Sequence, residues 1–79
     1  MYYVYLIKSI QFPEITYVGF TTNLKDRLSC HNRGDSIHIS KHKPWKLVMY
    51  LYFTDKVKAT AFEKYLKTQS GRAFAKKRF

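Results

Sequence analysis

The side chains that could do chemistry in this chain are two phenols, a guanidinium, an imidazole and a carboxylate. They belong to Tyr5, Tyr17, Arg27, His31 and Glu63. A guanidinium binds phosphate oxygens, an imidazole or a phenol can move a proton, and a carboxylate can hold a hard cation. If the fold brings these groups together, the set favours chemistry on a phosphate backbone over a purely structural role.

Both tyrosines lie in segments that are typical of β-strands. β-Branched and aromatic residues predict strands at 2–8 and 15–20, joined as a hairpin. Side chains alternate along a strand, so Tyr5 and Tyr17 can lie close together on one face of that hairpin. Gly19 lies on the same face, where it would leave room for a ligand or another backbone. The alternative is a pair of ordinary core aromatics whose hydroxyl groups reach the surface.

The segment after the hairpin is predicted to be a helix. Asn23 is a suitable N-cap, with Asp26 at the third helical position in a pattern that resembles a capping box. The helix is expected to run to about Asn32, and Gly34 is a plausible C′ residue.

One face of this helix mixes apolar and charged residues. Its members share the i, i+3, i+4, i+7 spacing: Leu24, Arg27, Leu28 and His31. The leucines predict that this face packs on the sheet. A guanidinium and an imidazole beside a packed surface are costly unless an anion meets them, which favours a functional role. The alternative is that both side chains reach water at the edge of the interface.

The rest of the chain predicts one more strand and two more helices. Residues 46–53 are almost continuously apolar, as expected of a central strand that is covered on both faces. Thr54 or Asp55 caps a helix that extends to about Lys67, and a last helix spans 70–78. The order β-β-α-β-α-α predicts an α/β (α+β) fold, with a small three-stranded, mainly antiparallel sheet flanked by helices.

Glu63 lies at the boundary of the apolar face of the second helix. That face is predicted to comprise Val57, Ala61, Phe62, Tyr65 and Leu66. Lys67 follows four residues later and could pair with Glu63, a contact that contributes only about 0.3–0.5 kcal/mol. The other interpretation is a single carboxylate ligand for Mg²⁺, which keeps several waters and takes further ligands from substrate phosphate. Taken alone, Glu63 is more simply explained by the ion pair.

The charge of the chain favours a polyanionic partner. Its 79 residues, expected to form one domain over 1–79, carry 15 Lys and Arg against 5 Asp and Glu, a formal charge of +10. Nucleic acid is the commonest partner of such a chain. The lone Cys30 excludes an internal disulfide framework and predicts a reducing, cytoplasmic location. There is neither a secretory signal nor an apolar stretch of the roughly 20 residues that span a bilayer, so no membrane partner is expected.

The order and spacing of these residues resemble those of the GIY-YIG nuclease superfamily. The residues that carry the resemblance are Tyr3-Val4-Tyr5, Tyr17-Val18-Gly19, Arg27, His31 and Glu63. Each motif is short, but their order and spacing together are specific, and they cover nearly the whole chain. The chain looks like the short standalone members of that superfamily.

The resemblance implies a metal-dependent endonuclease that hydrolyses phosphodiester bonds, with DNA favoured over RNA. Tyr5 and Tyr17 match the motif tyrosines; one of them, with a weak preference for Tyr17, would orient or deprotonate the attacking water. Arg27 would clamp the scissile phosphate, and His31 would hydrogen-bond near the nucleophile. Glu63 would hold one Mg²⁺ or Mn²⁺ ion, which acts as a Lewis acid. No small-molecule cofactor is implied.

Some positions depart from the family pattern. Tyr3 stands where the family name has glycine, and valine replaces isoleucine in both motifs. Many members carry an asparagine after the metal-binding helix, whereas residues 67–74 contain none, and Gln69 and Ser70 are the candidates to take its place. The alternative function is therefore a nucleic-acid-binding module of the same fold that cleaves weakly or not at all. A third interpretation is a basic structural subunit of a larger complex.

Contacts to nucleic acid are expected from cations around the candidate site. They lie on the first helix, in the loop before the third strand and on the last helix: Lys25, Arg33, Lys41, His42, Lys43, Arg72, Lys76 and Lys77. Trp45 could stack on a base but is expected to be a core anchor. His38 and His42 suggest zinc, but a second pair of ligands is missing and zinc is rejected. A homodimer is one way in which so small a domain could cut both strands.

Overall fold

The computed structural model describes residues 1–33 and 41–79. Its strands and helices are β1 (Tyr2–Ser9), β2 (Thr16–Thr21), α1 (Leu24–Arg33), β3 (Trp45–Phe53), α3 (Lys56–Leu66) and α4 (Gln69–Arg78). This order confirms the predicted β-β-α-β-α-α arrangement and its α+β class. Gly34, the predicted C′ residue of the first helix, lies outside the described residues. Within the described part of the chain, no helix combines the length and the apolar character needed to cross a membrane.

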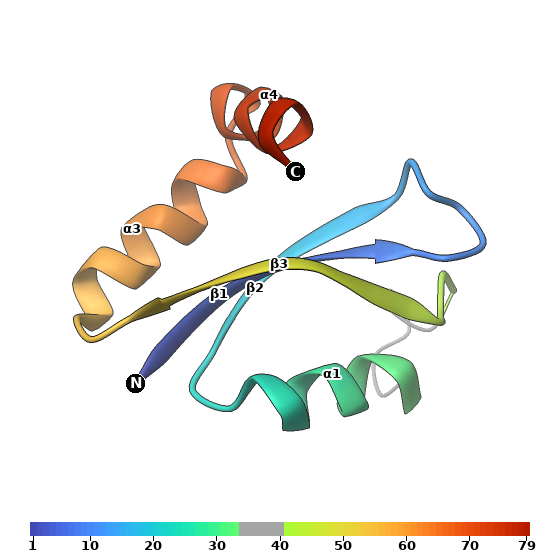
Figure 1. Cartoon of the computed structure of the whole chain (residues 1–79), viewed down its shortest axis with the longest axis horizontal. Helices are drawn as coiled ribbons and strands as arrows, with labels where there is room; N and C mark the ends of the chain where they lie inside the picture. The colour runs from blue at the N-terminus through green and yellow to red at the C-terminus, as the bar shows by residue number, and fades with distance from the viewer. Residues whose placement is uncertain (34–40) are drawn as a thin grey trace.

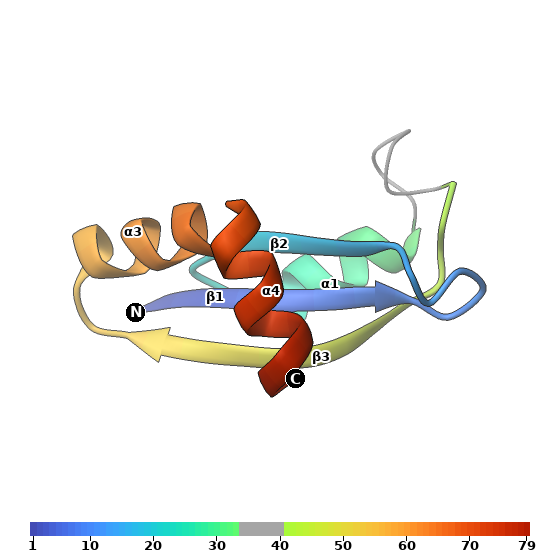
Figure 2. The same cartoon turned by 90° about the horizontal axis from the view of Figure 1, so that it is seen from above.

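β1 is the central strand of the sheet (Figure 1, Figure 2). The strand order is β2-β1-β3, and β1 pairs antiparallel with both neighbours. The prediction that residues 46–53 form the central strand is wrong, because β3 is an edge strand on which Tyr50, Leu51 and Tyr52 are exposed. Tyrosine made the run look buried, yet a phenol tolerates water and is common at a half-exposed edge. The run that is buried on both sides is Val4–Ile7 of β1.

The helices divide between the two faces of the sheet (Figure 1). On one face, α1 packs through Leu24 and Leu28 against a buried cluster that contains Tyr5. On the other face, α3 and α4 pack against the opposite side of β1, where Ala59 and Leu66 are buried. Because neighbouring side chains of β1 point to opposite faces, Tyr5 faces α1 and belongs to a different layer of the core from α3.

The start of α1 is set by Asn23, as predicted. Asn23 Oδ1 accepts a hydrogen bond from the Asp26 backbone N–H at 3.1 Å, and Asn23 Nδ2 donates to the Asp26 carboxylate at 3.0 Å. The backbone N–H of Asn23 is satisfied instead by Thr21 Oγ1 at 3.0 Å, so the arrangement differs from a capping box. A cap of this kind contributes about 1 kcal/mol. It also fixes where α1 begins, and therefore which face carries His31.

The packed face of α3 differs from the predicted one. Asp55 caps the helix by accepting a hydrogen bond from the Val57 backbone N–H at 2.8 Å. Val57 itself is 73% exposed, whereas Ala59 and Leu66 are buried. A small alanine lets the helix axis approach the sheet closely, and this decides which face turns inward. Glu63 shares that face at i+4 from Ala59, so its side chain is only 19% exposed.

Candidate active site

Tyr5 is the buried centre of the candidate site, with 1% of its surface exposed. Its hydroxyl group is hydrogen-bonded to Nε2 of His31 at 2.8 Å, and the tautomer of the imidazole decides which partner donates. Directly opposite Tyr5 in the hairpin lies Gly19. A Cβ atom at Gly19 would overlap the ring and hydroxyl of Tyr5. The prediction that Gly19 leaves room for a ligand is therefore wrong, because the phenol of Tyr5 fills that space.

Replacing Gly19 by alanine is expected to push the Tyr5 phenol away from His31. The ring is buried and the new methyl group has no free space, so we expect the free energy of unfolding to fall by about 1–3 kcal/mol, as in overpacked cores. Urea denaturation measures this loss. Thr16→Ala, at an exposed position of the same strand, is the matched control and should change the unfolding midpoint little. Equal midpoints for the Gly19 variant and the wild type would contradict the tight contact.

His31 lies between the two tyrosines. It is 6% exposed in the last turn of α1, and its ring centroid lies 5.7 Å from that of Tyr5 and 5.3 Å from that of Tyr17. Tyr17 is 40% exposed and pairs with Ile7, the next β1 residue on the face that carries Tyr5. The register thus confirms that both phenols share one face. Tyr17 is the phenol of this pair that reaches solvent.

Arg27 and Glu63 both act on the Tyr5 phenol electrostatically. Burial raises the pKa of Tyr5 well above its usual value, the charges of Tyr17 and Glu63 raise it further, and Arg27 lowers it. Burial also lowers the pKa of His31, and the neighbouring Arg27 lowers it further. At neutral pH, Tyr5 is therefore a protonated phenol and His31 a neutral imidazole. Side chains from β1, β2, α1 and α3 thus share one electrostatic environment.

The lowered pKa of His31 predicts that the fold loses stability in mild acid. Below the usual histidine pKa of 6.5 the unfolded chain binds a proton that the folded chain excludes, so the free energy of unfolding falls as the pH drops from 6.5 toward the folded pKa. The loss is confined to this window and levels off below the folded pKa. Urea denaturation at several pH values, with an NMR titration of the His31 ring, measures it. A His31 ring that titrates at or above 6.5 would contradict the account.

Glu63 interacts with two groups, the ammonium of Lys67 and the phenol of Tyr5. Lys67 Nζ lies 3.2 Å from its carboxylate, which confirms the expected i+4 ion pair. The same carboxylate acts on the buried Tyr5 phenol. In residues 1–33 and 41–79, no group of three or more His, Cys, Asp or Glu side chains could enclose a metal ion. A single, largely buried carboxylate fits the way Mg²⁺ is held, with waters and substrate phosphate as the other ligands.

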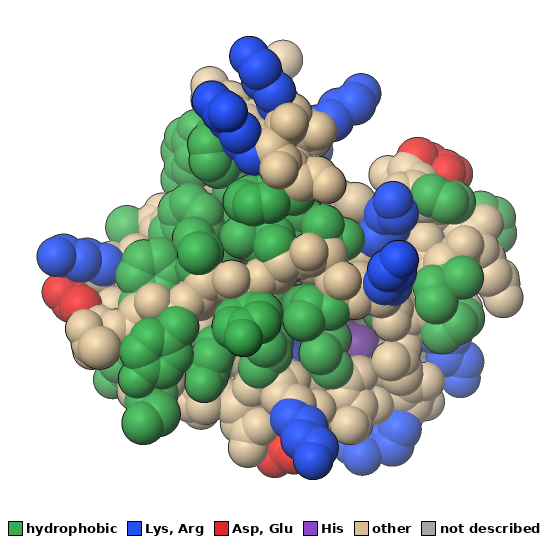
Figure 3. All heavy atoms as spheres, viewed as in Figure 1, with side chains coloured by type: hydrophobic (Ala, Val, Ile, Leu, Met, Phe, Trp, Pro, Cys, Tyr) green, Lys and Arg blue, Asp and Glu red, His purple; other side chains and the backbone are tan. Residues whose placement is uncertain are grey.

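The predicted nucleic-acid contacts do not gather into one patch. Lys25 and Arg33 lie at the two ends of α1, and Arg33 Nη2 donates to Cys30 Sγ at 3.1 Å. Lys41 and Lys43 are exposed just before β3. The remaining members are His42, beside that strand, and Arg72, Lys76 and Lys77 on α4. Figure 3 shows Lys and Arg side chains at several separate places on one face, with a group at α4. These positions are therefore distributed over several elements and do not form one continuous basic surface.

Two aromatic assignments in this region can be compared with the structure. Trp45 is 5% exposed and packs with Tyr5 and Ile7, which confirms that it is a core anchor. The ring of His42 meets Phe12 and Trp45 edge-on, at centroid distances of 5.6 and 6.3 Å. His38 lies outside the described residues. His42 therefore belongs to an aromatic contact at the hairpin end of the sheet.

A basic groove on the far face of the sheet was missed by sequence reasoning. It has a volume of about 800 Å³ and lies between α4 and the hairpin of β1 and β2. Arg72 and Lys76 line it, as does Lys8 of β1, which the sequence analysis did not single out. Tyr17, on the edge strand β2, is also one of its lining residues. The signal for Lys8 was its alternation with the buried Ile7, which turns it to the face opposite Tyr5.

Known proteins of two kinds are similar to this chain. A structure-specific endonuclease subunit SLX1 homolog from Drosophila mojavensis is 46% identical over 52 residues, which cover 60% of this chain and 17% of the relative. Another SLX1 homolog, from Giardia intestinalis, is 35% identical over 65 residues, or 77% of this chain and 18% of the relative. A UPF0213 protein from Clostridium perfringens is 37% identical over 68 residues, or 85% and 71% of the two chains. The chain thus spans less than a fifth of these two SLX1 relatives.

The match to a family model is more extensive than any of these pairwise similarities. The GIY-YIG catalytic domain model covers residues 1–78. That span includes every element of the fold and all five side chains of the candidate site. The chain therefore belongs to the GIY-YIG family, and this membership, together with its endonuclease relatives, supports a nuclease.

Proposed function

We propose that this chain is a metal-dependent endonuclease that hydrolyses phosphodiester bonds in DNA. The observation that carries the proposal is the environment of one buried phenol. Tyr5 is hydrogen-bonded to His31 and feels the charges of Tyr17, Arg27 and Glu63, although these residues come from four different elements. Family membership supports the same class of reaction, as does the similarity to structure-specific endonuclease subunits of the SLX1 type.

The two phenols would take different parts in the reaction. The raised pKa of Tyr5 keeps its phenol protonated at neutral pH, so it cannot take a proton from water and instead holds the neutral His31 ring in place. Tyr17 is more exposed, borders the same imidazole and can meet the attacking water from solvent. His31 can accept a proton because its lowered pKa keeps it neutral. We therefore place the attacking water next to Tyr17 and His31.

The charged residues would act on the phosphate. Arg27 is exposed on the α1 face that carries His31, where its guanidinium can bind the scissile phosphate and stabilise the charge that develops on it. Glu63 would hold Mg²⁺ or Mn²⁺, which when bound supplies Lewis-acid stabilisation of the phosphate and the leaving oxygen. Lys67 competes for the Glu63 carboxylate and would have to give way.

A non-catalytic nucleic-acid-binding module is the second candidate. It is favoured by the start of α4, where residues 69–71 contain no asparagine and both Gln69 and Ser70 are exposed. It is also favoured by the ion pair between Glu63 and Lys67, because a carboxylate engaged in this pair is not free to bind a metal ion. Both candidates share the +10 charge, so binding alone does not separate them.

Cleavage assays separate the two candidates. The protein is incubated with flapped, branched, duplex and single-stranded DNA, and with RNA of matched sequence, in Mg²⁺, in Mn²⁺ or with a chelator. The proposal predicts DNA cleavage that the chelator abolishes and added metal restores. Salt-sensitive binding without cleavage would support the binding module, because phosphate contacts alone give that behaviour. Cleavage that persists in the chelator would contradict the metal requirement. Cleavage of RNA that is faster than cleavage of DNA would contradict the assignment of DNA as the substrate.

A further inference from the structure

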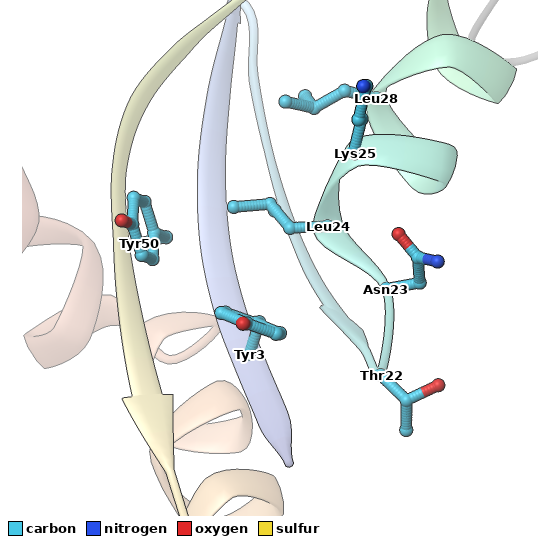
Figure 4. A pocket seen from close by; sticks show the side chains of 7 residues that line it. All are labelled: Tyr3, Thr22, Asn23, Leu24, Lys25, Leu28 and Tyr50. Atoms are coloured by element: carbon cyan, nitrogen blue, oxygen red, sulfur yellow. The ribbon is translucent and has the colours of Figure 1, made fainter.

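A second cavity lies beside the candidate site, between the strands and α1 (Figure 4). It has a volume of about 530 Å³ and is lined by Tyr3 of β1, Tyr50 of β3 and Leu24 and Leu28 of α1. This volume falls within the roughly 300–1,000 Å³ that is usual for small-ligand sites. In Figure 4, Leu24 points from α1 toward β1, while the two tyrosine rings stand on the strands.

Tyr3 and Tyr50 of this cavity form an aromatic platform with the neighbouring Tyr52, which does not line the cavity. Tyr50 and Tyr52 are 50% and 46% exposed, although both rings are large and partly apolar. The ring centroids of Tyr3 and Tyr50 lie 5.9 Å apart at an interplanar angle of 59°, and those of Tyr3 and Tyr52 lie 5.3 Å apart at 71°. Neither pair is stacked face to face, so a flat ligand can still stack on a ring face. Nucleobases bind in this way on the aromatic residues of single-strand-binding proteins.

The rim of the cavity supplies a cation for the phosphate of a nucleotide. Lys25 and Asn23 line it together with the apolar residues. Lys25 is exposed and can bind a phosphate, whereas the amide of Asn23 is already used in capping α1. The chain carries a charge of +10, so an anionic ligand is favoured over a neutral aromatic one.

The cavity lies next to the candidate active site along β1 and α1. Tyr3 and Tyr5 are two residues apart on one strand and face the same side, which separates them by about 7 Å. Leu28 of the cavity wall directly follows Arg27, the residue proposed to bind the scissile phosphate. A nucleotide whose phosphate lies at Arg27 can thus place a neighbouring base against Tyr3 and Tyr50.

We propose that this cavity binds an unpaired nucleobase next to the scissile phosphate, an inference that rests on the proposed nuclease function. A base inside a duplex is stacked and paired, and it can enter such a cavity only at the cost of leaving the stack. The substrate is therefore a nucleic acid with an unpaired nucleotide beside the cleavage position, such as a flap or a branch. Tyr3, which replaces the glycine of the family name, forms part of this base-binding wall.

The test compares Tyr50→Ala with the wild type for binding to a flapped DNA and to a fully paired duplex of the same length. Tyr50→Ala is expected to weaken binding of the flapped DNA by about 5- to 150-fold, the range for loss of one stacked base. Binding of the duplex should change little. Tyr50→Phe keeps the ring and should retain affinity for the flapped DNA. Tyr65→Ala removes an exposed tyrosine of α3 outside the cavity and is the matched control.

A fluorescent base analogue makes the contact itself visible. With 2-aminopurine at the unpaired position, stacking on tyrosine should quench its emission in the wild type and in Tyr50→Phe, but not in Tyr50→Ala. Circular dichroism of each variant establishes that it is folded.

The outcomes separate this inference from the proposed function. Cleavage of the flapped DNA with equal affinity in the wild type and Tyr50→Ala would overturn the base site and leave the nuclease intact. Binding of the flapped DNA that depends on Tyr50, without any cleavage, would support the base site and contradict the proposed nuclease function. A third outcome is that the wild type is a dimer, Tyr50→Ala is a monomer and both bind the flapped DNA equally well. This result would overturn the inference and would assign the surface as an interface between copies of the chain.

Discussion

Replacing Glu63 by glutamine is expected to lower kcat for DNA cleavage by at least about 10³-fold, because a metal held as proposed would contribute several kcal/mol to the stability of the transition state. The amide keeps the size of the side chain and removes only its charge. We expect the fold to persist, since the ion pair that is lost with Lys67 contributes at most about 0.5 kcal/mol. Single-turnover cleavage in saturating Mg²⁺ measures the rate, and urea denaturation measures the stability.

Lys67→Gln is the matched control for the Glu63 variant. It breaks the same ion pair from the other side and leaves the carboxylate in place. If Glu63 serves only the ion pair, both variants should show the same kcat. If Glu63 holds the metal, only Glu63→Gln should lose activity. Equal rates in the two variants would therefore remove Glu63 from the mechanism.

Replacing Arg27 by alanine is expected to lower kcat by about 10²–10³-fold, as for the loss of one preorganised group that stabilises transition-state charge. Arg27 is exposed, so the stability of the fold should change little. Arg27→Lys should recover part of the rate, because lysine keeps the charge but not the two-pronged geometry of the guanidinium. Cleavage kinetics of the three proteins measure the effect.

A second readout checks where Arg27 lies. Its charge lowers the pKa of His31, so that pKa should rise in Arg27→Ala and stay low in Arg27→Lys. An NMR titration of the imidazole reports this without any substrate. A His31 pKa that does not respond to the loss of Arg27 would place the guanidinium away from the candidate site, whatever the effect on cleavage.

Local sequence patterns predicted the elements of this fold and part of its site. The alternation in β1 and β2 placed Tyr5 and Tyr17 on one face, and the cap at Asn23 placed His31 on the packed side of α1. These outcomes follow from the period of a strand or helix and from short-range hydrogen bonds. The hydrogen bond between Tyr5 and His31 spans 26 residues, and the sequence analysis did not anticipate it.

The wrong predictions share one cause, which is that packing between elements decides exposure. Residues 46–53 look as apolar as a central strand, but the pairing of β1 with both neighbours leaves β3 at the edge. Val57 looks like a core residue, but the close approach at Ala59 turns it outward. Gly19 looks like an opening, but a long side chain from the opposite strand fills it. The exposure of each of these residues depends on a contact with a residue distant in sequence or on how a helix is rotated against the sheet. Local sequence patterns carry information on neither.

The most direct test of the central claim is to locate the metal by anomalous diffraction in crystals of Tyr17→Phe with bound flapped DNA and Mn²⁺. The account predicts one Mn²⁺ peak within about 2.1 Å of a Glu63 carboxylate oxygen and of a scissile-phosphate oxygen. Arg27 should contact the same phosphate. A peak bound elsewhere, or a scissile phosphate that lies away from Glu63 and Arg27, would contradict the claim that these side chains form one phosphate-cleaving site.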